Sequence, residues 1–300
     1  VCAEGNVIAE RFAYPRRETQ MGTPREGRGI RGGDLDNDGL PDLVINHQYD
    51  EVTRVYYGPG FWTPEKNNEI VPHVDIKTGR AAQWIDIIDI DGDGYNDIVT
   101  SETDRGNILI AWNSDERENW SVDSFDQAQV PTHLSAVDWD QDGYGDVIIY
   151  LERSNVTMLR RGSPTRELLP ATSLGTLASE ATAFPALSGT RSSLVTLAEP
   201  DLLKTYIQGD AGQLVQEDMI PVPTPGQWKK LGTGITNERR VVFLQSSAGP
   251  ITQFTNTEPG VWEGCRVRFA LRFRFLFRFQ LCCFSFLFQA LLFLAFLFRL

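Results

Sequence analysis

The chain has 300 residues and a net charge of −12, from 28 Lys and Arg against 40 Asp and Glu. This length predicts one large domain or two ordinary ones, and 41% hydrophobic residues are enough for a substantial core. Six Arg and no acidic residue lie in 265–300, which leaves 22 basic and 40 acidic residues, a net charge of −18, in 1–264. So acidic a body argues against a nucleic-acid partner, because phosphates are bound through Lys and Arg.

The cysteines and the start of the chain give little support for a particular compartment. Three of the four cysteines fall in 265–300, and Cys2 has no partner in the body, so no disulfide framework is expected. No signal peptide is visible after Val1. We expect either that a leader has been removed or that the chain is a piece of a longer protein.

Three acidic segments align without gaps, at 34–42, 89–97 and 138–146, and are named loops 1, 2 and 3. Each reads Asp-x-Asp-x-Asp-Gly-x-x-Asp and lies among short runs rich in Val, Ile, Tyr and Trp. The body has no long stretch of helical period, and the second unit predicts strands at 84–88, 98–100, 107–112 and 120–125. This pattern predicts an all-β fold with about four strands per unit. Repeats of this length favour a β-propeller of four-stranded blades.

The same frame extends through two further units that lack the acids. Aligning Leu194 and Val241 with Ile98 places the loop starts at Pro185 and Gly232. The positions of the four Asp then hold Pro185, Leu187, Gly189 and Ser193 in the fourth unit and Gly232, Gly234, Thr236 and Arg240 in the fifth. We therefore expect a propeller domain at 1–264, with five blades at 29–75, 80–128, 130–175, 176–222 and 226–264, the last two free of metal.

The acidic loops have the composition of calcium sites. Ca²⁺ takes about 6–8 oxygens at roughly 2.3–2.6 Å, and alternate residues of a tight loop can direct carboxylates to one centre. Loop positions 1, 3, 5 and 9 would supply side chains and position 7 a backbone carbonyl, while the Gly at position 6 allows the sharp reversal. Three ions are expected. Their ligands are Asp34, Asp36, Asp38, Leu40 and Asp42 in loop 1; Asp89, Asp91, Asp93, Tyr95 and Asp97 in loop 2; and Asp138, Asp140, Asp142, Tyr144 and Asp146 in loop 3.

Competing interpretations of the loops fit less well. An EF-hand needs helices on both sides and a bidentate acid at position 12, where Ile45, Thr100 and Ile149 stand. Solvated acidic turns would not require the same four Asp and Gly three times. Mg²⁺ is disfavoured because it demands stricter octahedral geometry. Since four carboxylates repel one another, each loop is expected to be ordered only with its cation.

At these residues the body resembles the FG-GAP/VCBS repeat family, the calcium-loop propellers of integrin α-subunits and bacterial surface proteins. Residues 55–62, Val-Tyr-Tyr-Gly-Pro-Gly-Phe-Trp, are similar to the motif that names the family. The resemblance implies one blade per unit, calcium between the first two strands, and an adhesion, ligand-binding or structural role outside the cytoplasm or at the cell surface. The family is commonly seven-bladed, so five units imply either a fragment or a blade begun elsewhere and completed by 7–14.

Sequence motifs for catalysis are absent. His47, His73 and His133 show no zinc spacing, and no nucleophile elbow, phosphate loop or zinc-protease motif occurs. Two classes stay open: a non-enzymatic module that binds a protein or glycan, and a carbohydrate-active enzyme that resembles a polysaccharide lyase propeller. Trp residues near the strands are expected in packing between blades, with a few of them available to stack on sugar rings.

The tail at 265–300 has a different composition from the body. It holds 11 of the 17 Phe, and 279–298 is uncharged and long enough to span a bilayer. Five Arg on the body side would place the body in the cytoplasm by the positive-inside rule. Three interpretations stay open: a frame-shifted or low-complexity artefact, a membrane anchor, and a pair of strands.

Overall fold

The computed structural model describes residues 27–58, 73–80, 82–115, 117–127, 129–176, 181–186, 191–198, 202–209, 213–222, 228–236, 239–246, 251–258 and 261–267. Every regular element in these segments is a β-strand, and no helix occurs among them. The prediction of an all-β fold is therefore confirmed.

The strands form five antiparallel sheets of four strands, each a meander in chain order. Both ends of every strand expected in the second unit lie within two residues of those observed. The first sheet contains β1 (Gly27–Gly33), β2 (Asp42–His47), β3 (Val52–Tyr56) and β4 (Val74–Lys77); the second β5 (Ala82–Ile88), β6 (Asp97–Glu102), β7 (Asn107–Trp112) and β8 (Ser121–Asp126); the third β9 (His133–Val137), β10 (Asp146–Leu151), β11 (Val156–Arg160) and β12 (Thr172–Gly175); the fourth β13 (Ala181–Phe184), β14 (Ser193–Ala198), β15 (Leu202–Gln208) and β16 (Leu214–Pro221); the fifth β17 (Trp228–Thr236), β18 (Arg239–Ser246), β19 (Ile251–Glu258) and β20 (Val261–Val267).

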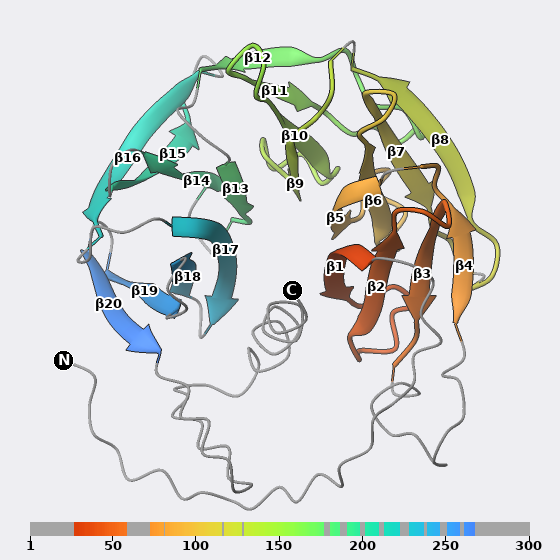
Figure 1. Cartoon of the computed structure of the whole chain (residues 1–300), viewed down its shortest axis with the longest axis horizontal. Helices are drawn as coiled ribbons and strands as arrows, with labels where there is room; N and C mark the ends of the chain where they lie inside the picture. The colour runs from red at the N-terminus through yellow and green to blue at the C-terminus, as the bar shows by residue number, and fades with distance from the viewer. Residues whose placement is uncertain are drawn as a thin grey trace, which may run out of the picture.

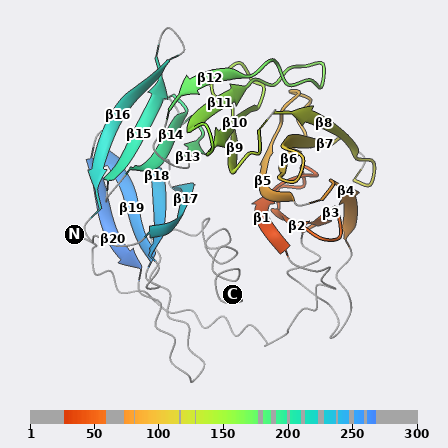
Figure 2. The same cartoon turned by 45° about the horizontal axis from the view of Figure 1, so that its top comes forward.

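The five sheets stand side by side around a common centre, with the first strand of each innermost and the fourth outermost (Figure 1). The inner strands contact one another in chain order: β1 with β5, β5 with β9, β9 with β13, and β13 with β17. In Figures 1 and 2 the described sheets form an open arc, with the first and fifth at its two ends. Radial four-stranded sheets of this kind are the blades of a β-propeller.

Position within the blade is reflected in the burial of the strands and in the composition of β10 and β8. The second strands β6 and β10 are buried along their whole length, because they are covered on both faces. Such strands are expected to read as nearly continuous apolar runs, as Val-Ile-Ile-Tyr-Leu does in β10. The outer strand β8 is mostly exposed and carries Ser and Asp.

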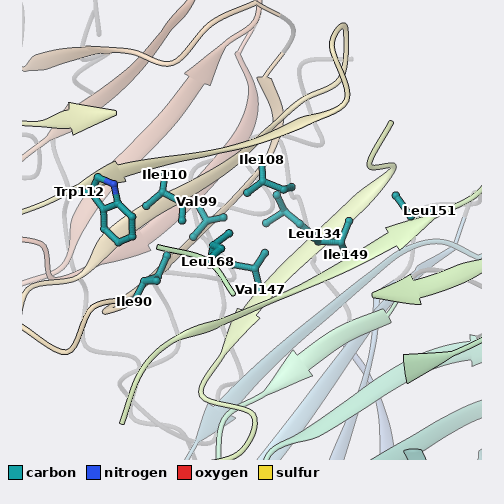
Figure 3. Packing of buried hydrophobic residues seen from close by; sticks show 10 residues of the cluster. All are labelled: Ile90, Val99, Ile108, Ile110, Trp112, Leu134, Val147, Ile149, Leu151 and Leu168. Atoms are coloured by element: carbon teal, nitrogen blue, oxygen red, sulfur yellow. The ribbon is translucent and has the colours of Figure 1, made fainter. Parts of the chain in front are cut away.

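Apolar side chains fill the spaces between neighbouring blades, as Figure 3 shows for the second and third. This cluster contains Ile90, Val99, Ile108, Ile110, Trp112, Leu134, Val147, Ile149, Leu151 and Leu168. Full burial of one such aliphatic side chain is worth about 1.5–3 kcal/mol. Ile90 occupies position 2 of loop 2, and Leu35 and Trp139 occupy it in loops 1 and 3, all at most 1% exposed. The acidic loops are therefore anchored in the core between the blades.

The fourth and fifth blades join their first two strands differently from each other. In the fourth, Pro185 follows β13 directly and Ser193 begins β14, as the alignment predicts, while Leu187 and Gly189 lie outside the described residues. In the fifth, the loop expected at 232–240 is wrong. Gly234 pairs with Val241 and Thr236 with Arg239, so these positions belong to β17 and β18. These positions carry no carboxylates that could fold the chain into a separate loop. The backbone hydrogen bonds between β17 and β18 therefore continue through them.

Several expectations fall on residues that the structure does not describe: the segment 7–14, Trp62, and the tail from 268 onward. β20 continues to Val267, three residues past the domain boundary expected after Gly264. Among the described residues, no helix is long and apolar enough to cross a membrane. The predicted span 279–298 lies outside them.

Candidate metal centres

Each acidic loop connects the first strand of a blade to its second. Loop 1 lies between β1 and β2, loop 2 between β5 and β6, and loop 3 between β9 and β10. Position 9 is the first residue of the second strand in all three blades. The loops therefore lie at equivalent ends of three neighbouring blades.

A glycine at position 6 makes the reversal in each loop. The backbone φ angles of Gly39, Gly94 and Gly143 are 81°, 92° and 93°, a left-handed region that side chains rarely adopt. A Cβ built at any of these glycines meets nothing within 4 Å. Backbone conformation, and not lack of space, therefore selects glycine here.

The carboxylates at positions 1 and 3 organise the backbone of the loop. The N–H of Gly94 donates to Asp89 Oδ2 at 2.8 Å, and its counterparts Gly39 and Gly143 donate to Asp34 and Asp138 at 3.0 and 3.1 Å. The N–H of position 5 donates to position 3 in loops 1 and 2, at 3.2 Å in both. These bonds fold the carboxylates toward the interior of the turn.

The position-9 carboxylates are fully buried and hold both ends of the loop. Asp97 Oδ2 accepts the N–H of Ile90 at 3.0 Å, and its Oδ1 accepts the N–H of Asn113, just after β7, at 2.8 Å. Asp42 and Asp146 make the same two bonds in their blades. One side chain thus ties the loop to the end of the third strand.

Burial makes these position-9 carboxyls hard to ionise. Burial raises the pKa of Asp42 to about 6, of Asp97 to about 8 and of Asp146 to about 7. The backbone hydrogen bonds of these carboxyls lower the pKa, but the effect of burial is larger. The nearby loop carboxylates raise these pKa values further. A cation close to the carboxylates would favour the charged form.

In every loop the side chains of positions 1, 3 and 9 come together. One carboxylate oxygen from each lies within 4.8 Å of the others: Asp34, Asp36 and Asp42; Asp89, Asp91 and Asp97; Asp138, Asp140 and Asp146. Asp34 Oδ1 and Asp140 Oδ1 are buried and lack a hydrogen-bond partner among the described residues. Acceptors without donors, in a group of three hard oxygen ligands, fit a cation such as Ca²⁺ or Mg²⁺. These clusters could hold metal ions.

Positions 5 and 7 lie beside this group. The carboxylates of Asp38, Asp93 and Asp142 are outside the three clusters, and Oδ1 of each accepts the N–H of position 7. Position 7 is Leu40, Tyr95 or Tyr144, whose expected contribution is its backbone carbonyl. The assignment of positions 5 and 7 as ligands stays a prediction.

Contacts between blades also fix the loops, and the sequence did not reveal them. The carbonyl of position 1 accepts a hydrogen bond from position 8 of the following blade each time, although the donor differs. Asn96 Nδ2 donates to Asp34 at 2.8 Å, Gly145 N to Asp89 at 2.7 Å, and Ser192 Oγ to Asp138 at 2.6 Å. Adjacent loops are therefore linked directly.

The sequence likewise gave no prediction that three arginines would lie at the loops. Arg117, Arg161 and Arg166 form ion pairs with Asp36, Asp140 and Asp91, all at position 3. A signal was present, because Arg117 and Arg166 both follow the first Asp of the loop in their own blade by 28 residues. The signal could not be interpreted without knowing that both side chains reach into the preceding blade.

Histidine and tryptophan side chains weighed for other roles are largely internal. His47 is 2% and His133 7% exposed, and burial lowers the pKa of both, that of His133 to about 3. His47, at the end of β2, is therefore part of the interior. Trp112 and Trp139 are each 1% exposed and pack in clusters between blades.

Comparison with known families agrees with this geometry. Residues 34–100 and 89–149 match the FG-GAP-like repeat. Residues 34–149 belong to the FG-GAP-like repeat family. The two matches begin at position 1 of loops 1 and 2, and together they include all three loops. No curated protein matches the chain. The fourth and fifth blades lie outside the FG-GAP-like matches and share the four-stranded topology.

Proposed function

We propose that this FG-GAP-like propeller is a calcium-stabilised module for binding or adhesion that works outside the cytoplasm. The observation that supports it best is the threefold repetition of one carboxylate cluster at the same end of successive blades. Each loop offers four Asp and a position-7 carbonyl to an ion. A bound ion would neutralise charge that otherwise separates these carboxylates.

Calcium suits these loops better than magnesium. Ca²⁺ accepts 6–8 oxygens in flexible geometry, whereas Mg²⁺ demands near-ideal octahedral coordination. A short loop with monodentate carboxylates, a carbonyl and water meets the first requirement more easily. Extracellular calcium modules work at roughly 10⁻⁴–10⁻³ M, which agrees with a location outside the cytoplasm.

The face opposite the metal loops is the proposed binding surface. The second strand of each blade begins at the loop and ends at a turn at its other end: 48–51, 103–106 and 152–155. Tyr49, in the first of these turns, is 51% exposed. Binding residues favour loops on a rigid frame, and calcium would act by ordering that frame. The partner would be a protein or a glycan.

A polysaccharide lyase is the alternative function, and it finds less support. Such an enzyme needs a base able to reach a sugar and basic subsites for a uronate. His47 and His133 are buried, and the body carries a net charge of −18. No observation on the described residues specifically favours catalysis.

Thermal unfolding of the full chain tests the metal part of the proposal. Melting should occur at a lower temperature in excess chelator, recover fully with Ca²⁺, and recover much less with Mg²⁺, because an ion that binds only the folded state stabilises it by mass action. An unchanged melting temperature in chelator contradicts the calcium proposal.

Binding arrays and polysaccharide digestion test the remaining part. A reproducible glycan or protein ligand, lost when the exposed turns are altered, supports the binding role. Release of unsaturated sugars, abolished by one His or Lys substitution outside the acidic loops, supports the lyase instead.

A further inference from the structure

Each metal loop has one guanidinium against its position-3 carboxylate. Arg117 Nη2 lies 2.6 Å from Asp36 Oδ2, Arg166 Nε 2.7 Å from Asp91 Oδ2, and Arg161 Nε 3.0 Å from Asp140 Oδ2. Arg117 and Arg166 also approach the position-5 carboxylates Asp38 and Asp93, at 4.0 and 3.2 Å. All three contacts therefore meet the same carboxylate of the loop.

Two of these arginines come from the following blade by the same route. Arg117 lies between β7 and β8 and reaches loop 1, and Arg166 lies between β11 and β12 and reaches loop 2. Each guanidinium carbon also lies over an aromatic ring of the blade it reaches: Tyr57 at 5.2 Å for Arg117, and Trp112 at 5.9 Å for Arg166. Tyr57 and Trp112 both follow position 1 of their own loop by 23 residues.

Loop 3 obtains its guanidinium by a different route. In the fourth blade, the connection between β15 and β16 is the short segment 209–213, Gly-Asp-Ala-Gly-Gln, which contains no arginine. Arg161 follows position 1 of loop 3 by 23 residues, the place that Tyr57 and Trp112 occupy in the earlier blades. Where the arginine from the next blade is absent, the blade itself supplies one. The guanidinium is thus present at all three loops although its source changes.

The arginine and a metal ion would use the same carboxylate. Asp36 and Asp91 are almost fully buried, with side chains 4% and 5% exposed. In both, Oδ1 already accepts the N–H of position 5 and Oδ2 faces the arginine. An ion bound to the position-3 carboxylate must share it with a positive charge a few ångströms away, and two cations at that distance repel strongly.

We propose that Arg117, Arg161 and Arg166 are built-in counter-cations that hold the position-3 carboxylate when no ion is bound and are displaced when the loop takes up calcium. This inference rests on the proposed calcium function. It assigns two effects to each arginine: it weakens calcium binding to its loop, and it stabilises the loop without calcium. Arg117 and Arg166 connect two blades. Calcium uptake in loops 1 and 2 therefore replaces an ion pair between blades with coordination of the ion within one blade. Uptake in loop 3 does not.

Calorimetric titration of the full chain with Ca²⁺ tests the inference at loop 2. Loops 1 and 3 are first disabled by Asp36→Asn and Asp140→Asn, so that one site remains. Adding Arg166→Gln should then tighten calcium binding roughly tenfold, since a cation near the ion is removed. The same substitution in the otherwise unchanged chain should lower the melting temperature in excess chelator.

Arg153→Gln is the matched control. Arg153 is an exposed arginine of the third blade, in the turn between β10 and β11 at the opposite end of the blade from loop 3. Its replacement by Gln removes the same positive charge as Arg166→Gln does. It should leave both calcium affinity and the melting temperature in chelator nearly unchanged.

The outcomes separate this inference from the proposed function. A wild-type chain that takes up no calcium contradicts the proposed function and displacement together, and this is seen before any arginine is changed. If wild type binds calcium but Arg166→Gln binds it equally or more weakly, only the counter-cation assignment is overturned. Weaker binding would show that Arg166 positions the ligand.

Discussion

The first three blades and the fifth share one sheet topology but connect their first two strands in opposite ways. In blades 1–3 a nine-residue acidic loop begins where the first strand ends, and position 9 opens the second strand. In blade 5, β17 continues to Thr236 and β18 starts at Arg239, so the corresponding residues are paired in the ladder. The blade therefore forms without the loop. The loop is an added feature that carboxylates and a turn glycine maintain.

Position 9 shows what replaces the carboxylate. Asp42, Asp97 and Asp146 are fully buried, and each accepts two backbone N–H groups. Blade 5 has no acidic loop, and the sequence alignment of its second strand places the buried Arg240 at this position; Arg240 donates to the carbonyl of Arg191 in blade 4 and lies over the ring of Phe184. The position thus keeps a polar residue in blade 5. There the residue bonds to the neighbouring blade, whereas the Asp residues bond within their own blade.

Calcium removal should affect the two groups of blades unequally, and this is the largest expected effect. One site saturated at a thousand times its dissociation constant contributes about 4 kcal/mol, and three sites are available. Hydrogen exchange in chelator should accelerate in 34–42, 89–97 and 138–146 and in the strands beside them. Exchange in β17 and β18 should change little. Uniform acceleration across all five blades would contradict a local role for the ions.

Substitutions at position 9 should separate the two groups next. Asp146→Ala leaves the buried N–H groups of Trp139 and Gly162 without acceptors, at about 1–3 kcal/mol each, and removes a metal ligand. Ser193→Ala, at the same position of blade 4, removes a buried hydroxyl whose Oγ lacks a hydrogen-bond partner among the described residues. The urea midpoint should fall strongly for the first and by almost nothing for the second. Equal shifts would disprove the alignment of blade 4.

Glycine substitutions should give a smaller contrast. A Cβ on Gly162 in blade 3 would lie 2.5 Å from the carbonyl oxygen of Ile90 in loop 2, and backbone atoms cannot move aside easily. Gly162→Ala should therefore cost about 1–3 kcal/mol. Gly209→Ala in blade 4 meets side-chain atoms of Gln213 and Val215, which can rotate, and should cost less in the same denaturant titration.

A pH series should show whether the metal-free loops hold protons. Without calcium, the raised pKa of Asp97, about 8, and of Asp146, about 7, means that the folded state holds protons that the unfolded state has lost. Stability in chelator should thus fall as pH rises through 7 and 8. Calcium keeps these groups charged, so the gain in melting temperature on adding Ca²⁺ should increase from pH 6 to pH 9. A gain independent of pH would argue against protonated carboxyls in the metal-free loops.

The sequence alone determined the blades and the loops of the first three units, because both depend on neighbours in the chain. Alternating carboxylates, a glycine at position 6 and short apolar runs act over nine or ten residues, so their pattern is legible without a fold. The prediction of a loop in the fifth unit was wrong for the same reason. Its predicted placement rested on spacing alone. Gly232 and Gly234 carry no carboxylate that could fold the chain into a loop, so they pair as strand residues.

Only the tertiary structure decided which groups meet across blades. Arg166 reaches Asp91 from 75 residues away, and Asn96, Gly145 and Ser192 perform one task with three different donors. A side-chain amide, a backbone N–H and a hydroxyl share no sequence pattern, since geometry at the blade interface selects the donor.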